Sequence, residues 1–387
     1  MEERSIPIDQ LFILERSNFQ SLIDALKAAC YLPIGPKIQN GAVILGEIEH
    51  AENLPIGMRD TQEASSYKLE NGGGMLFGYS LGPQSWKKYL FPPTQNLFAV
   101  KRSKNGWKDV STNEKIPDYA FLGIRPCEIK AIDILDEIFI NGEFADPAYS
   151  ARRRNNFILA VNCTRPGGNC FCTSMGTGPR AKTGYDLAVT EMKTDNSHFF
   201  LVEIGSEKGA GIVQQIKVRP AAETEIETAE TVMEESAASM KLAIDNTGLK
   251  ELLQSNIDHS HWDKIASRCL TCGNCTMVCP TCFCTTVEDS TDLQGNEAFR
   301  RRTWDSCFTM DYSYIHGGSV RYSSAARYRQ WLMHKFANWH DQFGSAGCVG
   351  CGRCITWCPA GIDITKEIRA FQDLEIKEKS IQTVKED

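Results

Sequence analysis

The chain has 387 residues, of which 42% are hydrophobic, and its formal net charge is −7. This length suits two or three domains with apolar cores, and the acidic balance gives no indication of binding to nucleic acid or to an anionic membrane. Residues 1–8 lack the basic region and apolar run of a signal peptide, and no run of about 18 apolar residues is present that could span a membrane.

Hydrophobic patterns predict an α/β or α+β domain over residues 1–255. In chain order we expect a helix over 17–30, sheet with loops over 33–100, a buried strand over 118–124, a helix over 126–139, a strand over 154–162, a strand pair over 185–190 and 198–204, and an acidic helical stretch over 220–268. The rest of the chain, 256–387, contains most of its cysteines.

Eight of the sixteen cysteines form two copies of one pattern, C-x2-C-x2-C-x3-C-P. This is the run that holds [4Fe–4S] clusters in two-cluster ferredoxins, where the fourth cysteine of each run serves the other cluster. Crossed ligation predicts two sets of four ligands: Cys269, Cys272, Cys275 and Cys358 for cluster 1, and Cys348, Cys351, Cys354 and Cys279 for cluster 2. Zinc is the alternative, but zinc sites use C-x2-C pairs and give no reason for a third closely spaced cysteine or for the prolines that follow.

The two cysteine runs are separated by the long insert 280–347, which is rich in helix formers around 321–339. We therefore expect residues 256–387 to form a mostly helical two-cluster ferredoxin domain. Because metal-binding thiols require a reducing compartment, we expect the protein in the cytoplasm of an anaerobic or microaerobic cell.

Four cysteines of the first domain could hold a third cluster. Cys127 and Cys163 each follow a buried strand, and neighbouring parallel strands deliver their carboxyl ends to one edge of a sheet. Cys170 and Cys172 lie in the polar loop that follows. The four would supply a complete set of thiolates, and the alternative is that they are packing residues.

The remaining cysteines leave two interpretations open. Cys282, Cys284 and Cys307 are one thiol short of a cluster, and Asp305 could supply the fourth ligand of a possible fourth site. They could equally pack around cluster 1 and shield it from water. Cys30 stands alone on an apolar helix face and is expected in the core.

We find no fingerprint for a nucleotide, a flavin or an acid–base catalytic set in the sequence. The motifs that are present resemble those of one family over residues 117–370. They are Gly-Ile-Arg-Pro-Cys127, Cys170-Phe-Cys172, Cys279-Pro-Thr-Cys-Phe-Cys284, Trp304-Asp-Ser-Cys307 and the second ferredoxin run. Together they resemble the beta subunit of cytosolic sulfhydrogenases, which are NAD(P)-linked [NiFe] hydrogenases. They are equally similar to the related iron–sulfur component of anaerobic sulfite reductase.

The resemblance implies a non-catalytic electron-transfer subunit. In this family a partner subunit holds FAD and a [2Fe–2S] centre and reacts with NAD(P)H, while terminal chemistry occurs on hydrogenase small and large subunits or on a sulfite reductase catalytic subunit. An alternative is a catalytic role for an open-site cluster at Cys282, Cys284 and Cys307.

Overall fold

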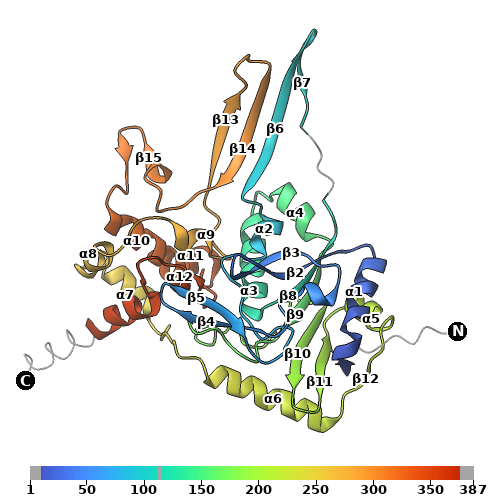
Figure 1. Cartoon of the computed structure of the whole chain (residues 1–387). Coiled ribbons are helices and arrows are strands. Elements are labelled where there is room, and N and C mark those ends of the chain that lie inside the picture. The colour runs from blue at the N-terminus through green and yellow to red at the C-terminus, as the bar shows by residue number, and fades with distance from the viewer. Residues whose placement is uncertain (1–9, 112–115, 375–387) are drawn as a thin grey trace, which may run out of the picture.

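The computed structural model describes residues 10–111 and 116–374 (Figure 1). The segment 1–8, on which the expectation about a signal peptide depends, lies outside the described residues. Within the described residues, no helix is both long and apolar enough to cross a membrane.

An eight-stranded sheet organises the first part of the chain. Its strands, in spatial order, are β12 (Arg219–Pro220), β1 (Leu11–Glu15), β11 (His198–Ile204), β10 (Leu187–Lys193), β9 (Phe157–Val161), β8 (Tyr119–Ile124), β2 (Leu32–Gln39) and β3 (Ala42–Glu47). The four strands from β10 to β2 are parallel, and the outer pairs are antiparallel. Strands β8 and β9 are almost entirely buried, as expected for parallel strands covered on both faces.

Helices cover this sheet: α1 (Phe19–Ala28), α2 (Lys87–Leu90), α3 (Pro126–Phe139), α4 (Pro147–Arg153), α5 (Glu207–Val213) and α6 (Glu223–Ala238), with 3₁₀ turns η1 (Arg16–Asn18) and η2 (Ala51–Asn53). Helix α3 has the predicted bounds because Pro126 begins it and Glu128 caps its first turn. The predicted helix near 17–30 and strands near 118–124, 154–162, 185–190 and 198–204 are confirmed within a few residues.

The cysteine-rich part contains short helices packed around their own apolar core. They are α7 (Leu249–Ser255), α8 (His261–Ala266), α9 (Asn274–Met277), η3 (Asp311–Ser313), α10 (Ser324–Met333), the π-helical turn η4 (His334–Asn338), α11 (Trp339–Phe343), α12 (Arg353–Thr356) and a further helical stretch over 364–374. Helix α10 begins at Ser324, where the Ser323 hydroxyl caps Ala326 N.

The predicted mostly helical character of this part is not confirmed. The insert opens with a hairpin, β13 (Thr285–Thr291) and β14 (Glu297–Trp304), and has a small one, β15 (Tyr314–Ile315) and β16 (Gly318–Ser319). Strand β14 also pairs with β6 (Thr94–Ser103) of the first part, whose partner is β7 (Gly106–Asp109). Figure 1 shows these four strands as an arm extending away from the rest.

The fold is thus mixed α and β, with a sheet domain followed by a cysteine-rich domain. The β6–β14 pairing and a hairpin near it, β4 (Met58–Glu63) with β5 (Ser66–Asn71), connect the two parts. The Gln62 side chain of β4 accepts a hydrogen bond of 2.8 Å from the Thr356 hydroxyl of α12. The boundary near residue 255 stays a prediction, and strands from both sides of it share one sheet.

Candidate metal centres

The two ferredoxin loops have the same backbone shape. In each, the third and fifth positions have left-handed backbones: Thr271 and Gly273 in the first loop, Gly350 and Gly352 in the second. In each, the N–H of the third residue donates to the first cysteine's sulfur at 3.4 Å. A short helix follows each glycine cap and carries the third cysteine in its first turn. The repeated spacing therefore produces two equivalent thiol cradles.

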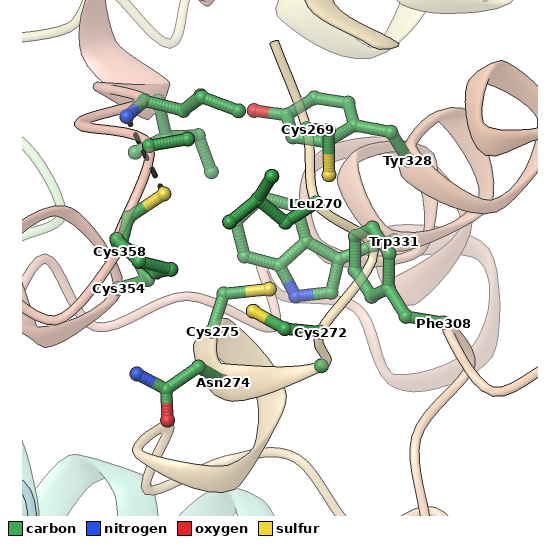
Figure 2. Close-up of a pocket in the computed structure, with 15 residues that line it drawn as sticks. Cys269, Leu270, Cys272, Asn274, Cys275, Phe308, Tyr328, Trp331, Cys354 and Cys358 are labelled. Atoms are coloured by element: carbon green, nitrogen blue, oxygen red, sulfur yellow. Dashed lines mark hydrogen bonds between the residues drawn. The ribbon is translucent and has the colours of Figure 1, made fainter.

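The first cradle opens into an apolar pocket of about 450 Å³ (Figure 2). The cysteines that line it are Cys269, Cys272, Cys275, Cys354 and Cys358. Figure 2 shows the first loop's thiols around Leu270 and Trp331, with Cys358 arriving from the second loop. The Asn274 side-chain amide donates to Trp357 O and holds the loops together. The structure thus brings the predicted ligand set of cluster 1 into one pocket.

The second set is deeper in the protein. The Cys354 thiol lies close enough to Cys348, Cys351 and Cys279 for each to raise its pKa, after the larger effect of burial. Burial also raises the pKa of Cys348 to about 12. A buried thiol is stable as a thiolate only beside compensating positive charge, which iron supplies, so this donor set fits a cluster. Among the described residues, no three His, Cys, Asp or Glu side chains are arranged to hold a single metal ion.

The four first-domain cysteines converge as predicted from the strand ends. Cys127, Cys163, Cys170 and Cys172 line a second pocket of about 450 Å³. Cys127 lies in the first turn of α3, after β8, and Cys163 lies two residues beyond the neighbouring strand β9. Topology alone therefore places two of these thiols, and the Cys-Phe-Cys loop places the other two.

This pocket also has buried positive charge. Arg125 and Arg353 line it, and both are at least nine-tenths buried. Arg353 donates from Nη2 to Glu128 Oε1 at 2.7 Å, while its buried Nη1 has no hydrogen-bond partner. An orphaned buried guanidinium nitrogen beside four thiols fits a bound anionic group such as a thiolate-ligated cluster. Sequence reasoning missed Arg353, although it lies between two cysteines of the second ferredoxin run.

The Cys-Phe-Cys loop is packed directly against the second ferredoxin loop. Phe171 N donates to Gly350 O at 2.8 Å. A Cβ on Gly350 would lie 2.6 Å from Cys172 Cα, and one on Gly352 would lie 2.2 Å from Asn169 O. Both glycines are therefore required by close backbone approach as well as by their positive φ. Cys351, a predicted cluster 2 ligand, lines the pocket of the third set.

The third group of cysteines is divided in two. A hydrogen bond from Cys307, with another from Tyr312, lowers the pKa of Cys284 to about 6. Cys282 instead pairs with Cys279, the predicted cluster 2 ligand. The Asp305 carboxylate accepts from Ser306 N at 2.7 Å. A fourth cluster site and a packing role both stay predictions, and Tyr312 is a neighbour that sequence reasoning missed.

The expectation that Cys30 is a core residue is wrong. Its side chain is exposed, and its φ of 65° places it in a left-handed position just beyond the end of α1. The helical periodicity therefore stops before this residue, and its side chain leaves the apolar face.

Comparison with known proteins agrees with this geometry. The profile of the 4Fe-4S dicluster domain matches residues 268–362, which include both loops and the insert. By class, the protein is therefore a dicluster iron–sulfur protein.

The chain is 34% identical over 283 residues to sulfhydrogenase 2 subunit beta of Pyrococcus furiosus, an alignment that covers 72% of this chain and 80% of the relative. It belongs to the family of sulfhydrogenase beta subunits and is an iron–sulfur electron-transfer subunit, which confirms the resemblance inferred from its motifs. A comparison with solved structures gave no match.

Proposed function

We propose that this subunit relays single electrons between an FAD and [2Fe–2S] subunit that reacts with NAD(P)H and the terminal metal subunits of a multi-subunit oxidoreductase. One observation carries the proposal: three sets of four cysteines lie in contact, one after another. Cys354 borders the pocket of the first set, and Cys351 borders that of the third. The second set therefore lies between the other two.

We assign one [4Fe–4S] cluster to each set, with crossed ligation in the first two. Cluster 1 takes Cys269, Cys272, Cys275 and Cys358, and cluster 2 takes Cys348, Cys351, Cys354 and Cys279. Cluster 3 takes Cys127, Cys163, Cys170 and Cys172. Convergence of each set and the buried arginines at the third support this assignment. When bound, the clusters supply one-electron redox chemistry, and the chain's own residues bind them and exclude water.

Hydride chemistry is assigned to a partner. A nicotinamide gives up two electrons as hydride and needs an acceptor such as flavin, whereas a cluster takes one electron at a time. The sequence carries no flavin or dinucleotide fingerprint. A [NiFe] hydrogenase, with its small and large subunits, is the complex we favour because the Pyrococcus relative is a sulfhydrogenase subunit. Anaerobic sulfite reductase is the alternative, and we place the complex in the cytoplasm.

Metal analysis of the anaerobically purified chain tests the cluster assignment. We expect about twelve irons and as many sulfides per chain, three clusters' worth. The double variant Cys127→Ser/Cys163→Ser should lose about four irons and one electron paramagnetic resonance (EPR) signal. The exposed Cys30 supplies the matched control, and Cys30→Ser should keep every cluster. A Cys127→Ser/Cys163→Ser protein with full iron content would contradict the third site.

A redox assay of the same preparation tests the relay. Dithionite should reduce the clusters, and the reduced chain should pass electrons to NAD⁺ only after a flavoprotein partner is added. Reduction of NAD⁺ by the chain alone would overturn the proposed division of labour.

A further inference from the structure

Two lysines are buried between the ferredoxin loops and the first domain. Lys335 is 4% exposed and Lys87 is 3% exposed. Burying an ammonium group costs several kcal/mol unless negative charge and hydrogen bonds compensate it. Ion pairs of other lysines are present, but in the described ranges neither of these two has a carboxylate within 4 Å. The compensating groups must therefore be the thiols around them.

Lys335 is fixed by three contacts that involve both ferredoxin runs. Its Nζ donates to Cys279 Sγ at 3.2 Å, to Thr281 Oγ1 at 3.1 Å and to Gly347 O at 3.3 Å. Thr281 is fully buried and donates to the same Gly347 oxygen at 2.7 Å. An ammonium group has three protons, so these contacts use its full donor capacity. One of them is directed at a predicted cluster 2 ligand.

The insert delivers this lysine through an irregular helix. Lys335 lies in the π-helical turn η4, between α10 and α11. Such turns are rare and often occur at functional sites, because they change the direction of a side chain within a helix. The neighbouring Phe336 and Ala337 are also buried, so packing holds the turn in place.

Lys87 offers an internal comparison. It is equally buried, but its Nζ donates to the backbone oxygen of Cys282 at 2.8 Å and lies 3.9 Å from the centre of the Trp304 ring. It therefore brings a second positive charge to the same region without a hydrogen bond to sulfur.

We propose that Lys335 sets the reduction potential of cluster 2 by donating an N–H···S hydrogen bond to Cys279. The inference rests on the proposed electron relay. Adding an electron makes a cluster more negative, and a nearby cation stabilises that state most strongly where the surroundings are dry. Hydrogen bonds to the sulfurs and burial are known determinants of cluster potential. Lys335 is a positioning residue that acts through Cys279 and makes cluster 2 easier to reduce.

A redox titration followed by EPR tests this assignment in the full chain. Lys335→Met keeps the length of the side chain and removes its charge and its donor. At a fixed potential we expect the ratio of reduced to oxidised cluster 2 to fall at least tenfold, which equals about 59 mV for a one-electron couple. Lys335→Arg should recover most of the loss, and Lys87→Met should give a smaller shift. Clusters 1 and 3 should move less than cluster 2 in every variant.

A Lys335→Met protein with full iron content and an unchanged cluster 2 potential would overturn the inference. If the variants do not assemble, wild-type protein labelled with ¹⁵N at lysine Nζ decides the question by pulsed EPR. A ¹⁵N coupling to reduced cluster 2 that persists in Lys87→Met supports the inference, and its absence overturns it. Failure of the proposed function would look different, because wild-type protein would then lack cluster 2.

Discussion

The two ferredoxin loops share a sequence pattern and a backbone shape, yet they lie in different surroundings. The first loop is at the surface: Cys272 is exposed and Leu270 is 65% exposed. The second is enclosed, with the first domain's Cys-Phe-Cys loop on one side. Lys335, bonded to Cys279, borders the same site. The repeat thus determines how thiols are arranged, and tertiary packing determines how much water, charge and neighbouring metal each set meets.

The largest expected effect concerns the exchange of the fourth cysteines between the loops. Cys358→Ser should remove cluster 1, and Cys279→Ser should remove cluster 2, because each of these residues lies with the other loop's thiols. Each variant should lose about four irons and a different EPR signal. Loss of the same signal in both variants would mean that ligation does not cross.

A smaller effect should distinguish equivalent positions in the two loops. Thr271 already has a side chain at its left-handed position, whereas Gly350 packs against the Cys172 backbone. Gly350→Ala should lower the free energy of unfolding by roughly 2–4 kcal/mol, through backbone strain and overpacking, while Thr271→Ala should change it by less than about 1 kcal/mol. Chemical denaturation under anaerobic conditions measures both.

The Gly350→Ala protein should also lose cluster 2 or cluster 3 signals, because the clash lies between their binding loops. Equal stability of the Gly350→Ala and Thr271→Ala proteins would show that the second loop is not held against the first domain as the structure has it.

The sequence predicted the features that depend on local spacing. The two cysteine runs, the Pro126 helix start and the strand ends before Cys127 and Cys163 follow from short-range patterns. They allowed three thiol sets to be named from the sequence, and the structure brings each set together.

Features that depend on distant partners were not predictable in the same way. The hairpin of β13 and β14 lies in a stretch expected to be helical, and β14 is paired with β6, which is far away in the sequence. Lys335 was one of many helix formers until the fold placed it beside Cys279. Arg353 has an obvious place in the motif, but its charge matters only because Glu128 and the third pocket lie beside it.

The smallest expected effect is a difference in rate between the two ferredoxin clusters. Cluster 1 has the exposed Cys272 as a ligand, while the cluster 2 thiols lie deeper in the protein. A water-soluble oxidant or iron chelator must approach a cluster closely, so we expect ferricyanide to destroy the cluster 1 EPR signal several-fold faster than that of cluster 2. The Cys358→Ser and Cys279→Ser proteins identify which signal belongs to which cluster, and Lys335→Met controls for a change in potential without a change in exposure. Equal decay rates, or faster loss of cluster 2, would show that the enclosure of the second loop opens in solution.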